Sequence, residues 1–176
     1  MTASGESAGA VAAHCSLSHP PPSISHLASF QVVVACDMLQ GVFAVLVYKG
    51  HIDADIFLLF FQLVVLPRIA GTGPRFLMLD NASWHDEDRL RTAAAASGHR
   101  LGFRPVHSPD FGFVESTISH AEGVLQEHKE SITRENFADW IRAAFESIGA
   151  LLVQGFAHDT HYVVPGRLHK PYFGQQ

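Results

Sequence analysis

Lysine and arginine are scarce in this chain of 176 residues: there are twelve of them against seventeen Asp and Glu, and the formal net charge is −5. Proteins that bind nucleic acid on their own usually carry a basic excess, because neutralised phosphates supply most of the non-specific affinity. The lack of such an excess argues against strong DNA binding by this chain alone.

Cysteines and long apolar runs are scarce too. Cys15 and Cys36 occur in unrelated contexts, which excludes a disulfide framework and a zinc pattern and favours a reducing compartment. The most apolar segment, residues 56–66, contains Gln62 and is too short to cross a bilayer. The first nine residues are small and polar without a basic stretch, unlike a secretory signal. We therefore expect an intracellular protein that is not secreted and has no membrane partner.

The sequence does contain enough apolar side chain for one packed domain. Apolar residues make up 47% and charged residues 16%, a balance that excludes global disorder. Residues 1–28 are rich in Ser, Ala, Gly and Pro without periodicity, and we interpret them as a disordered or irregular lead-in. We expect the domain to cover residues 29–148, followed by a C-terminal extension over residues 149–176.

Strand and helix patterns alternate along the predicted domain. Two β-branched runs, at residues 30–36 and 42–48, predict an antiparallel hairpin. Helices and strands follow it, with Asp53 and Thr133 as N-caps and Gly98 as a C-cap. The helices are predicted at residues 54–69, 85–97, 111–129 and 133–147, and the strands at residues 75–79 and 101–105. This order implies an α/β fold with a mixed sheet flanked by helices.

Two acidic residues are candidates for chemistry. Asp80 follows the apolar strand of residues 76–79, at the edge where ligands bind in open α/β sheets, although an Asp after a strand is common and the local pattern alone favours a turn or helix cap. Glu115 lies near the start of a predicted helix, where the helix dipole favours a carboxylate. An ordinary first-turn Glu is the plain alternative.

The sequence around both acids provides a more specific signal. The stretch from Met78 to His85, Met-Leu-Asp-Asn-Ala-Ser-Trp-His, resembles the hydrophobic-Asp-Asn-Ala-x-x-His box of DDE transposases of the mariner superfamily. The stretch from Arg104 to Glu115, Arg-Pro-Val-His-Ser-Pro-Asp-Phe-Gly-Phe-Val-Glu, resembles that family's Leu-Pro-x-x-Ser-Pro-Asp-Leu-Asn-Pro-Ile-Glu box. The resemblance extends over residues 32–66 and includes a trailing helix similar to that of fungal members.

The resemblance implies a ribonuclease-H-like fold in which three carboxylates hold two divalent cations, Mg²⁺ or Mn²⁺, for phosphoryl transfer on DNA. By position, Asp80 would be the second acid and Glu115 the third, as catalytic residues and metal ligands, with Asn81 and His85 in support. His85 is equally well interpreted as an N-terminal helix residue. The resemblance also implies DNA as a partner, a nuclear location, and homodimer formation as an option.

The first acid of the family is missing. It should lie on the strand before residue 30, and residues 1–29 contain no Asp and only Glu6 as an acid. We therefore expect an N-terminally truncated sheet that lacks the first strand and has an unpaired edge. Asp37 is an alternative first acid, but a turn residue at the end of its strand is the favoured interpretation. The helix after Glu115 is also acidic, where the family has a basic one.

The histidines do not complete a metal site. His158 and His161, with Asp159, form the tightest group, and no Cys or further spaced His pair supplies four zinc ligands.

Two functional hypotheses remain. One is a DDE endonuclease domain for DNA cleavage and strand transfer, impaired by the missing Asp. The other is an inactive transposon remnant, or a domesticated protein that binds nucleic acid or protein.

Overall fold

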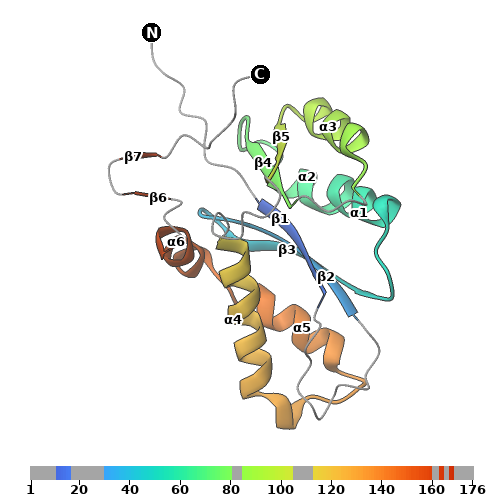
Figure 1. Ribbon diagram of the computed structural model, residues 1–176, viewed down its shortest axis with the longest axis vertical. Helices are drawn as coiled ribbons and strands as arrows, with labels where there is room; N and C mark the ends of the chain where they lie inside the picture. Colours follow the sequence, from blue (N-terminus) through green and yellow to red (C-terminus); the bar gives the residue numbers. More distant parts are fainter. Residues whose placement is uncertain are drawn as a thin grey trace.

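The middle layer of the protein is a mixed five-stranded sheet with helices on both faces (Figure 1). This computed structural model describes residues 30–80, 85–104 and 113–159, and the backbone of residues 11–16, 163–164 and 167–168. The spatial order of the strands is β3-β2-β1-β4-β5. They are β1 (Val11–Ser16), β2 (Phe30–Asp37), β3 (Gly41–Lys49), β4 (Phe76–Leu79) and β5 (Arg100–Phe103). The α/β class with a mixed, helix-flanked sheet is thereby confirmed.

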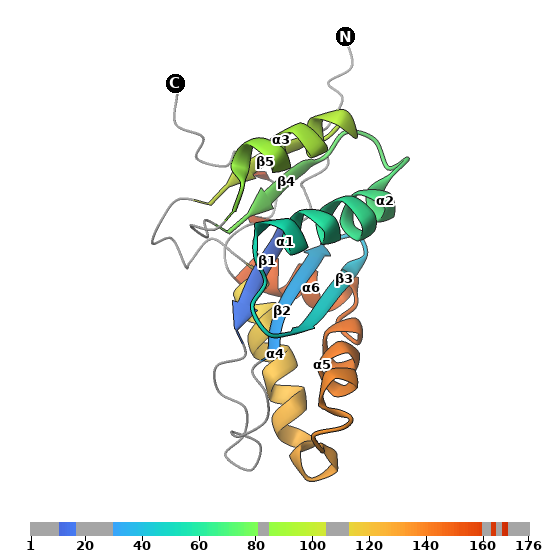
Figure 2. The same ribbon diagram turned by 90° about the vertical axis from the view of Figure 1, so that its right-hand side faces the viewer.

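Two groups of helices cover the sheet, one on each face (Figure 2). On one face lie α1 (Ala54–Phe60), the π-helical segment η2 (Phe61–Val65), α2 (Leu66–Ile69) and α3 (Glu87–Ala96). On the other lie α4 (Phe113–Glu127), α5 (Phe137–Glu146) and α6 (Ala150–Asp159), with the short 3-10 helix η4 (Lys129–Ser131) after α4. A two-stranded ribbon of β6 (Val163–Val164) and β7 (Arg167–Leu168) follows α6. None of the helices in the described part of the chain has the length and apolar character needed to span a bilayer.

Strand β1 lies at the centre of the sheet, so the expectation of a missing first strand was wrong. It runs antiparallel to β2, where Val11 pairs with Cys36, and parallel to β4, where Ala12 pairs with Leu79. Its sequence, Val-Ala-Ala-His-Cys-Ser, contains one β-branched residue and carries no strand pattern of its own. Pairing on both sides therefore accounts for the strand better than intrinsic propensity does. The segment interpreted as an irregular lead-in thus includes a regular element.

Alternate residues of the central strands enter two separate hydrophobic cores, as the period of two in a strand requires. Val33 and Leu79 belong to the core under α1, α2 and α3, and Val34 and Met78 belong to the core under α4, α5 and α6. Because both faces are covered, β2 and β4 read as continuous apolar runs, which is why they were predictable from sequence.

The predicted helix over residues 54–69 is one continuous element with a π-helical turn inside it. Its N-cap is Asp53, whose carboxylate accepts a hydrogen bond from the Ile56 N–H (2.9 Å), as predicted. The Leu66 N–H donates to the Phe61 carbonyl, five residues back. Pro67 follows Leu66 and has no N–H to donate, so the helix loses one regular hydrogen bond at this point. The π-helical turn lies directly before this position.

The C-terminal helices differ from the prediction. Helix α5 begins after Asn136, because the Thr133 N–H donates to Asn136 Oδ1 (2.7 Å) and holds both residues in a loop before the helix. Residues 149–176 were expected to form an extension, yet α6 packs on the sheet with Val153 and Ala157 fully buried. The Val42 N–H also donates to the Ile148 carbonyl (2.8 Å), which ties the α5–α6 connection to β3.

Candidate acidic site

Asp80 lies directly after β4 and is held by a buried histidine. His85 Nε2 is 3.0 Å from Asp80 Oδ1, and the two side chains are 1% and 26% exposed respectively. The His85 ring packs on Phe57 of α1, with ring centroids 4.4 Å apart. Asp86 is the N-cap of α3 and accepts from the Arg89 N–H (3.1 Å). Asp80 is therefore not the cap of α3. His85 lies before α3 and contacts the Asp80 carboxylate.

Glu115 lies in the first turn of α4 and forms an ion pair with Arg104. Arg104 Nη1 is 2.5 Å from Glu115 Oε1, and the arginine side chain is 7% exposed whereas the glutamate side chain is 48% exposed. Arg104 directly follows β5, and its backbone N–H donates to the Leu79 carbonyl (2.8 Å). The first turn of α4 is thus attached to the carboxyl end of β5.

Both acids predicted from sequence come to the same edge of the sheet. Strands β4 and β5 are parallel, and Leu79 pairs with Phe103. The residues that follow this pair, Asp80 and Arg104, leave the sheet side by side, and Arg104 brings Glu115 to them. Ligands of open α/β sheets bind at this carboxyl edge, so the arrangement matches a site for chemistry. Asn81, the other predicted supporting residue, lies outside the described residues.

Cys36 is fully buried on β2, one residue before Asp37. Burial raises the pKa of Cys36 to about 12; a hydrogen bond with Thr117 opposes the rise, and the charges of Asp37 and Glu115 add to it. Thr117 itself donates to the Phe113 carbonyl (2.8 Å) within α4. Because the thiolate is the nucleophile and the metal ligand, a protonated Cys36 serves as neither.

Asp37 lies at the opposite edge of the sheet and has a structural role. Strand β2 is antiparallel to β1, so its carboxyl end lies at the amino end of β1 and β4. Asp37 is fully buried, pairs with Arg75 Nη1 (2.5 Å), and accepts from the Leu39 and Gln40 N–H groups (2.8 and 2.6 Å). These contacts agree with the predicted turn residue and place Asp37 away from Asp80.

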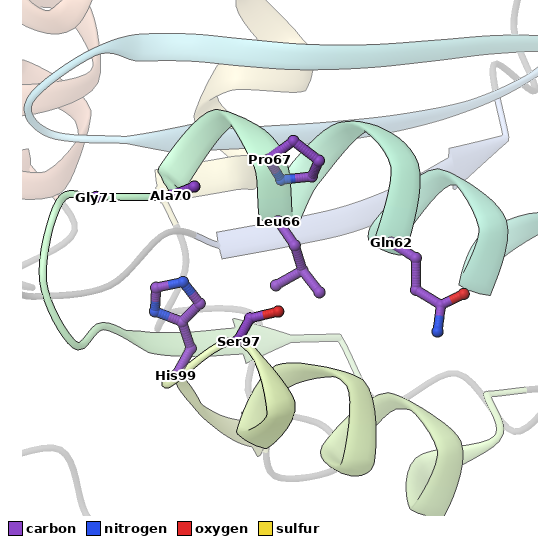
Figure 3. A pocket seen from close by; sticks show the side chains of 7 residues that line it. All are labelled: Gln62, Leu66, Pro67, Ala70, Gly71, Ser97 and His99. Carbon is purple, nitrogen blue, oxygen red and sulfur yellow. The ribbon is translucent and has the colours of Figure 1, made fainter.

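A cavity of about 350 Å³ also lies at that far edge (Figure 3). It is lined by Gln62, Leu66, Pro67, Ala70, Gly71, Ser97 and His99. Burial, and then the charge of Arg75, lower the pKa of His99, and His99 Nδ1 accepts from the Arg75 N–H (3.3 Å). His99 precedes β5 whereas Arg104 follows it, so this cavity is separate from the acidic site.

The residues of the acidic site do not fit a two-metal centre. Within the described ranges, no three His, Cys, Asp or Glu side chains gather closely enough to hold a metal ion. Asp80 and Glu115 are two carboxylates, and one of them is bound to a guanidinium. His158 and Asp159 form only an exposed pair, with Nδ1 and Oδ1 3.7 Å apart, and His161 lies outside the described residues.

Sequence reasoning did not find the Arg104–Glu115 pair. Arg104 opens the second box at the place where the resembling family has Leu. This departure was the available signal, since a charged residue at the end of a buried strand needs a partner. The partner is eleven residues further along the chain, beyond a turn, so spacing alone did not indicate it.

Comparison with known proteins agrees with this geometry. The family described as DDE superfamily endonuclease matches residues 20–138, more than half of the chain. The chain belongs to this family. Membership of the DDE superfamily endonuclease family supports phosphoryl-transfer nuclease chemistry as the function of this kind of domain. A search of curated proteins found no match.

Solved structures of transposases and integrases share the fold at low sequence identity. The catalytic domain of Mos1 transposase with raltegravir and Mn is 12% identical, with a TM-score of 0.65 over 85% of this chain and 76% of that chain. The Mos1 strand transfer complex is 11% identical, with a TM-score of 0.61 over 86% and 51%. The catalytic core domain of BIV integrase is 15% identical, with a TM-score of 0.54 over 87% and 98%. The ribonuclease-H-like fold expected from sequence is confirmed.

Proposed function

We propose that this chain is the catalytic-type domain of a mariner-like DDE transposase, built for metal-dependent phosphoryl transfer on DNA and impaired because the first carboxylate is absent. The main supporting observation is that Asp80 and Glu115 reach one edge of the sheet, next to the end of β5. Asp80 and Glu115 are assigned as the second and third acids of that site, with His85 as a positioning residue on Asp80. A nuclear or other intracellular location accompanies this proposal.

The cation of an intact site would be Mg²⁺ or Mn²⁺. Both are hard ions that prefer carboxylate oxygens, and the Mos1 catalytic domain has been solved with Mn and with Mg. Asp80 and Glu115 would supply oxygens, and the ion would neutralise charge on the reacting phosphate. With one acid missing, the ion has fewer ligands and would neutralise less of the charge on the phosphate. By analogy with the loss of one stabilising group, this raises the activation barrier by several kcal/mol and slows the reaction roughly 10²–10³-fold.

The register of β1 indicates where the first acid is missing. The family resemblance requires that acid on the first strand, and β1 is the strand that runs parallel to β4. Ala12 pairs with Leu79, so the next residue on each strand is Ala13 and Asp80. Ala13 therefore occupies the backbone position beside Asp80 where a carboxylate would complete the site.

Nicking of supercoiled plasmid DNA in Mn²⁺ tests this proposal. The unchanged chain should nick at or near background, and Ala13→Asp should nick at least tenfold faster. Adding Asp80→Ala to that variant should abolish the gain in nicking rate. Ala13→Asn introduces a side chain of nearly the same shape as Asp but without its charge, and should give no gain. The proposal fails if Ala13→Asp retains the circular dichroism of the unchanged chain yet nicks no faster than Ala13→Asn.

The second candidate is an inactive remnant or domesticated binding protein, and the net charge of −5 and the ion-paired Glu115 favour it. Weak DNA binding is expected in either case, because few cations are available to neutralise phosphates. Salt-dependent binding to plasmid DNA with no nicking by any variant, Ala13→Asp included, would support a binding protein over a nuclease.

A further inference from the structure

The Arg104 guanidinium lies where the proposed function requires a cation. We propose that Arg104 is an internal counter-ion of the acidic site, which neutralises Glu115 in place of a metal and weakens the site's affinity for divalent cations. This inference rests on the proposed function, because it concerns the same carboxylates. It assigns to Arg104 a role that the family resemblance does not provide.

The backbone holds the guanidinium in place. The Arg104 N–H donates to the Leu79 carbonyl (2.8 Å), which continues the β4–β5 ladder by one residue. The side chain is 7% exposed, so it is confined by its neighbours and does not extend into solvent. From this position Arg104 Nη1 reaches Glu115 Oε1 at 2.5 Å, a short, charge-assisted hydrogen bond. The pair is therefore a built feature of the fold and not a loose surface contact.

The charges explain why the pair opposes metal binding. A divalent cation at Glu115 would have to displace the guanidinium from Oε1 or bind beside it, where the two positive charges would repel each other. An arginine in a protein does not lose its proton, so no accessible pH removes this repulsion. Asp80 alone, which is already in contact with His85, would then have to hold the ion.

The sequence points to the substitution that would reverse this effect. The resembling box has Leu at the place of Arg104, and a leucine suits a position that is 7% exposed. Arg104→Leu removes the counter-ion and leaves Glu115, which is 48% exposed, accessible to an ion from solvent. Arg104→Lys keeps the charge at the same place and is the matched variant.

Titration of Mn²⁺, followed by electron paramagnetic resonance without DNA, tests the inference. Arg104→Leu should bind Mn²⁺ at least tenfold more tightly than the unchanged chain, and Arg104→Lys should not. Adding Asp80→Ala or Glu115→Gln to Arg104→Leu should remove the gain, since the ion needs both carboxylates. Arg91→Leu is the control for a general charge effect, because Arg91 contacts β5 through the Leu101 carbonyl (2.8 Å) and carries the same charge.

Thermal melting gives an independent readout on the same variants. In EDTA, Arg104→Leu should melt below the unchanged chain, and Mn²⁺ should raise its melting temperature but leave that of the unchanged chain in place. Arg104→Gln repeats the test with a polar side chain if the leucine variant does not fold. The inference is overturned if Arg104→Leu or, where that variant does not fold, Arg104→Gln binds Mn²⁺ no more tightly than the unchanged chain, or if Arg91→Leu gives the same gain.

Failure of this inference can be told apart from failure of the proposed function. Nicking by Ala13→Asp with no change in Mn²⁺ affinity for Arg104→Leu would retain the nuclease and reject the counter-ion. A gain in Mn²⁺ affinity for Arg104→Leu with no nicking by any Ala13→Asp variant would retain the counter-ion and reject the nuclease.

Discussion

Asp37 and Arg75 form a buried ion pair across the amino end of strand β1. Asp37 ends β2 and Arg75 precedes β4, and these are the two strands between which β1 lies. The side chains are 0% and 3% exposed, and the Arg75 Nε also donates to Thr72 Oγ1 (2.7 Å). The pair connects the β2–β3 hairpin to the β4–β5 half of the sheet, so it stabilises the same junction as β1.

Removing one partner of this pair is expected to be costly. Asp37→Ala would leave the Arg75 charge buried and unpaired, which typically costs about 3–5 kcal/mol, and it would also remove the turn contacts to Leu39 and Gln40. Urea denaturation of the purified variant measures the loss. Asp139→Asn, on α5 with a side chain 80% exposed, is the control and should change stability by less than about 0.5 kcal/mol. Equal stability of the two variants would contradict the structural role of Asp37.

Gly41 is expected to be sensitive to substitution. It has a φ of +82°, and a Cβ atom there would collide with the backbone of Ile148 and Gly149. Gly41→Ala therefore adds both strain and a clash, and should lower the free energy of unfolding by about 1–3 kcal/mol. Gly123→Ala, in α4 with no atom within 4 Å of the added Cβ, should raise it by about 0.5–1 kcal/mol. Chemical denaturation measures both effects. A lower free energy of unfolding for Gly123→Ala, or an unchanged one for Gly41→Ala, would contradict the prediction.

The thiol of Cys36 should make the protein less stable at high pH. Burial raises its pKa from 9.0 to about 12, so the native state retains a proton that the unfolded chain releases above pH 9. The contribution of Cys36 to the free energy of unfolding is therefore fully present below pH 9. It declines as the pH rises towards 12, with a slope of up to about 1.4 kcal/mol per pH unit. Urea denaturation between pH 8 and 10.5 should show a steeper decline for the unchanged chain than for Cys36→Ala. Parallel declines would show that Cys36 does not titrate differently in the two states.

The elements that could be predicted from sequence carry their signal locally. The runs that became β2 and β3 are rich in β-branched residues, and Asp53 caps α1 as expected. Gly98, with a φ of +78°, directly follows Ser97, the C-cap of α3. Asp80 follows an apolar strand, which alone indicates the edge of a sheet. These features need no knowledge of distant parts of the chain.

Strand β1 and the ion pair of Glu115 were missed because they depend on contacts between separate elements. Strand β1 pairs with β4, far along the chain, and its Ala, His, Cys and Ser residues give no periodic signal. The start of α5 was misplaced because Thr133 and Asn136 are both good caps, and their mutual hydrogen bonds decide between them. The ion pair of Glu115 required Arg104 to be placed by the β4–β5 ladder first.

The position of β1 has a practical consequence for where the domain should be cut. The family match begins at residue 20, so a boundary drawn there would remove residues 11–16 and with them the strand that joins β2 to β4. The sheet would be left as two separate pairs of strands, β2–β3 and β4–β5, and the edges of β2 and β4 that face β1 would lose their ladder hydrogen bonds. A recombinant fragment used to study Asp80 and Glu115 should therefore start before Val11.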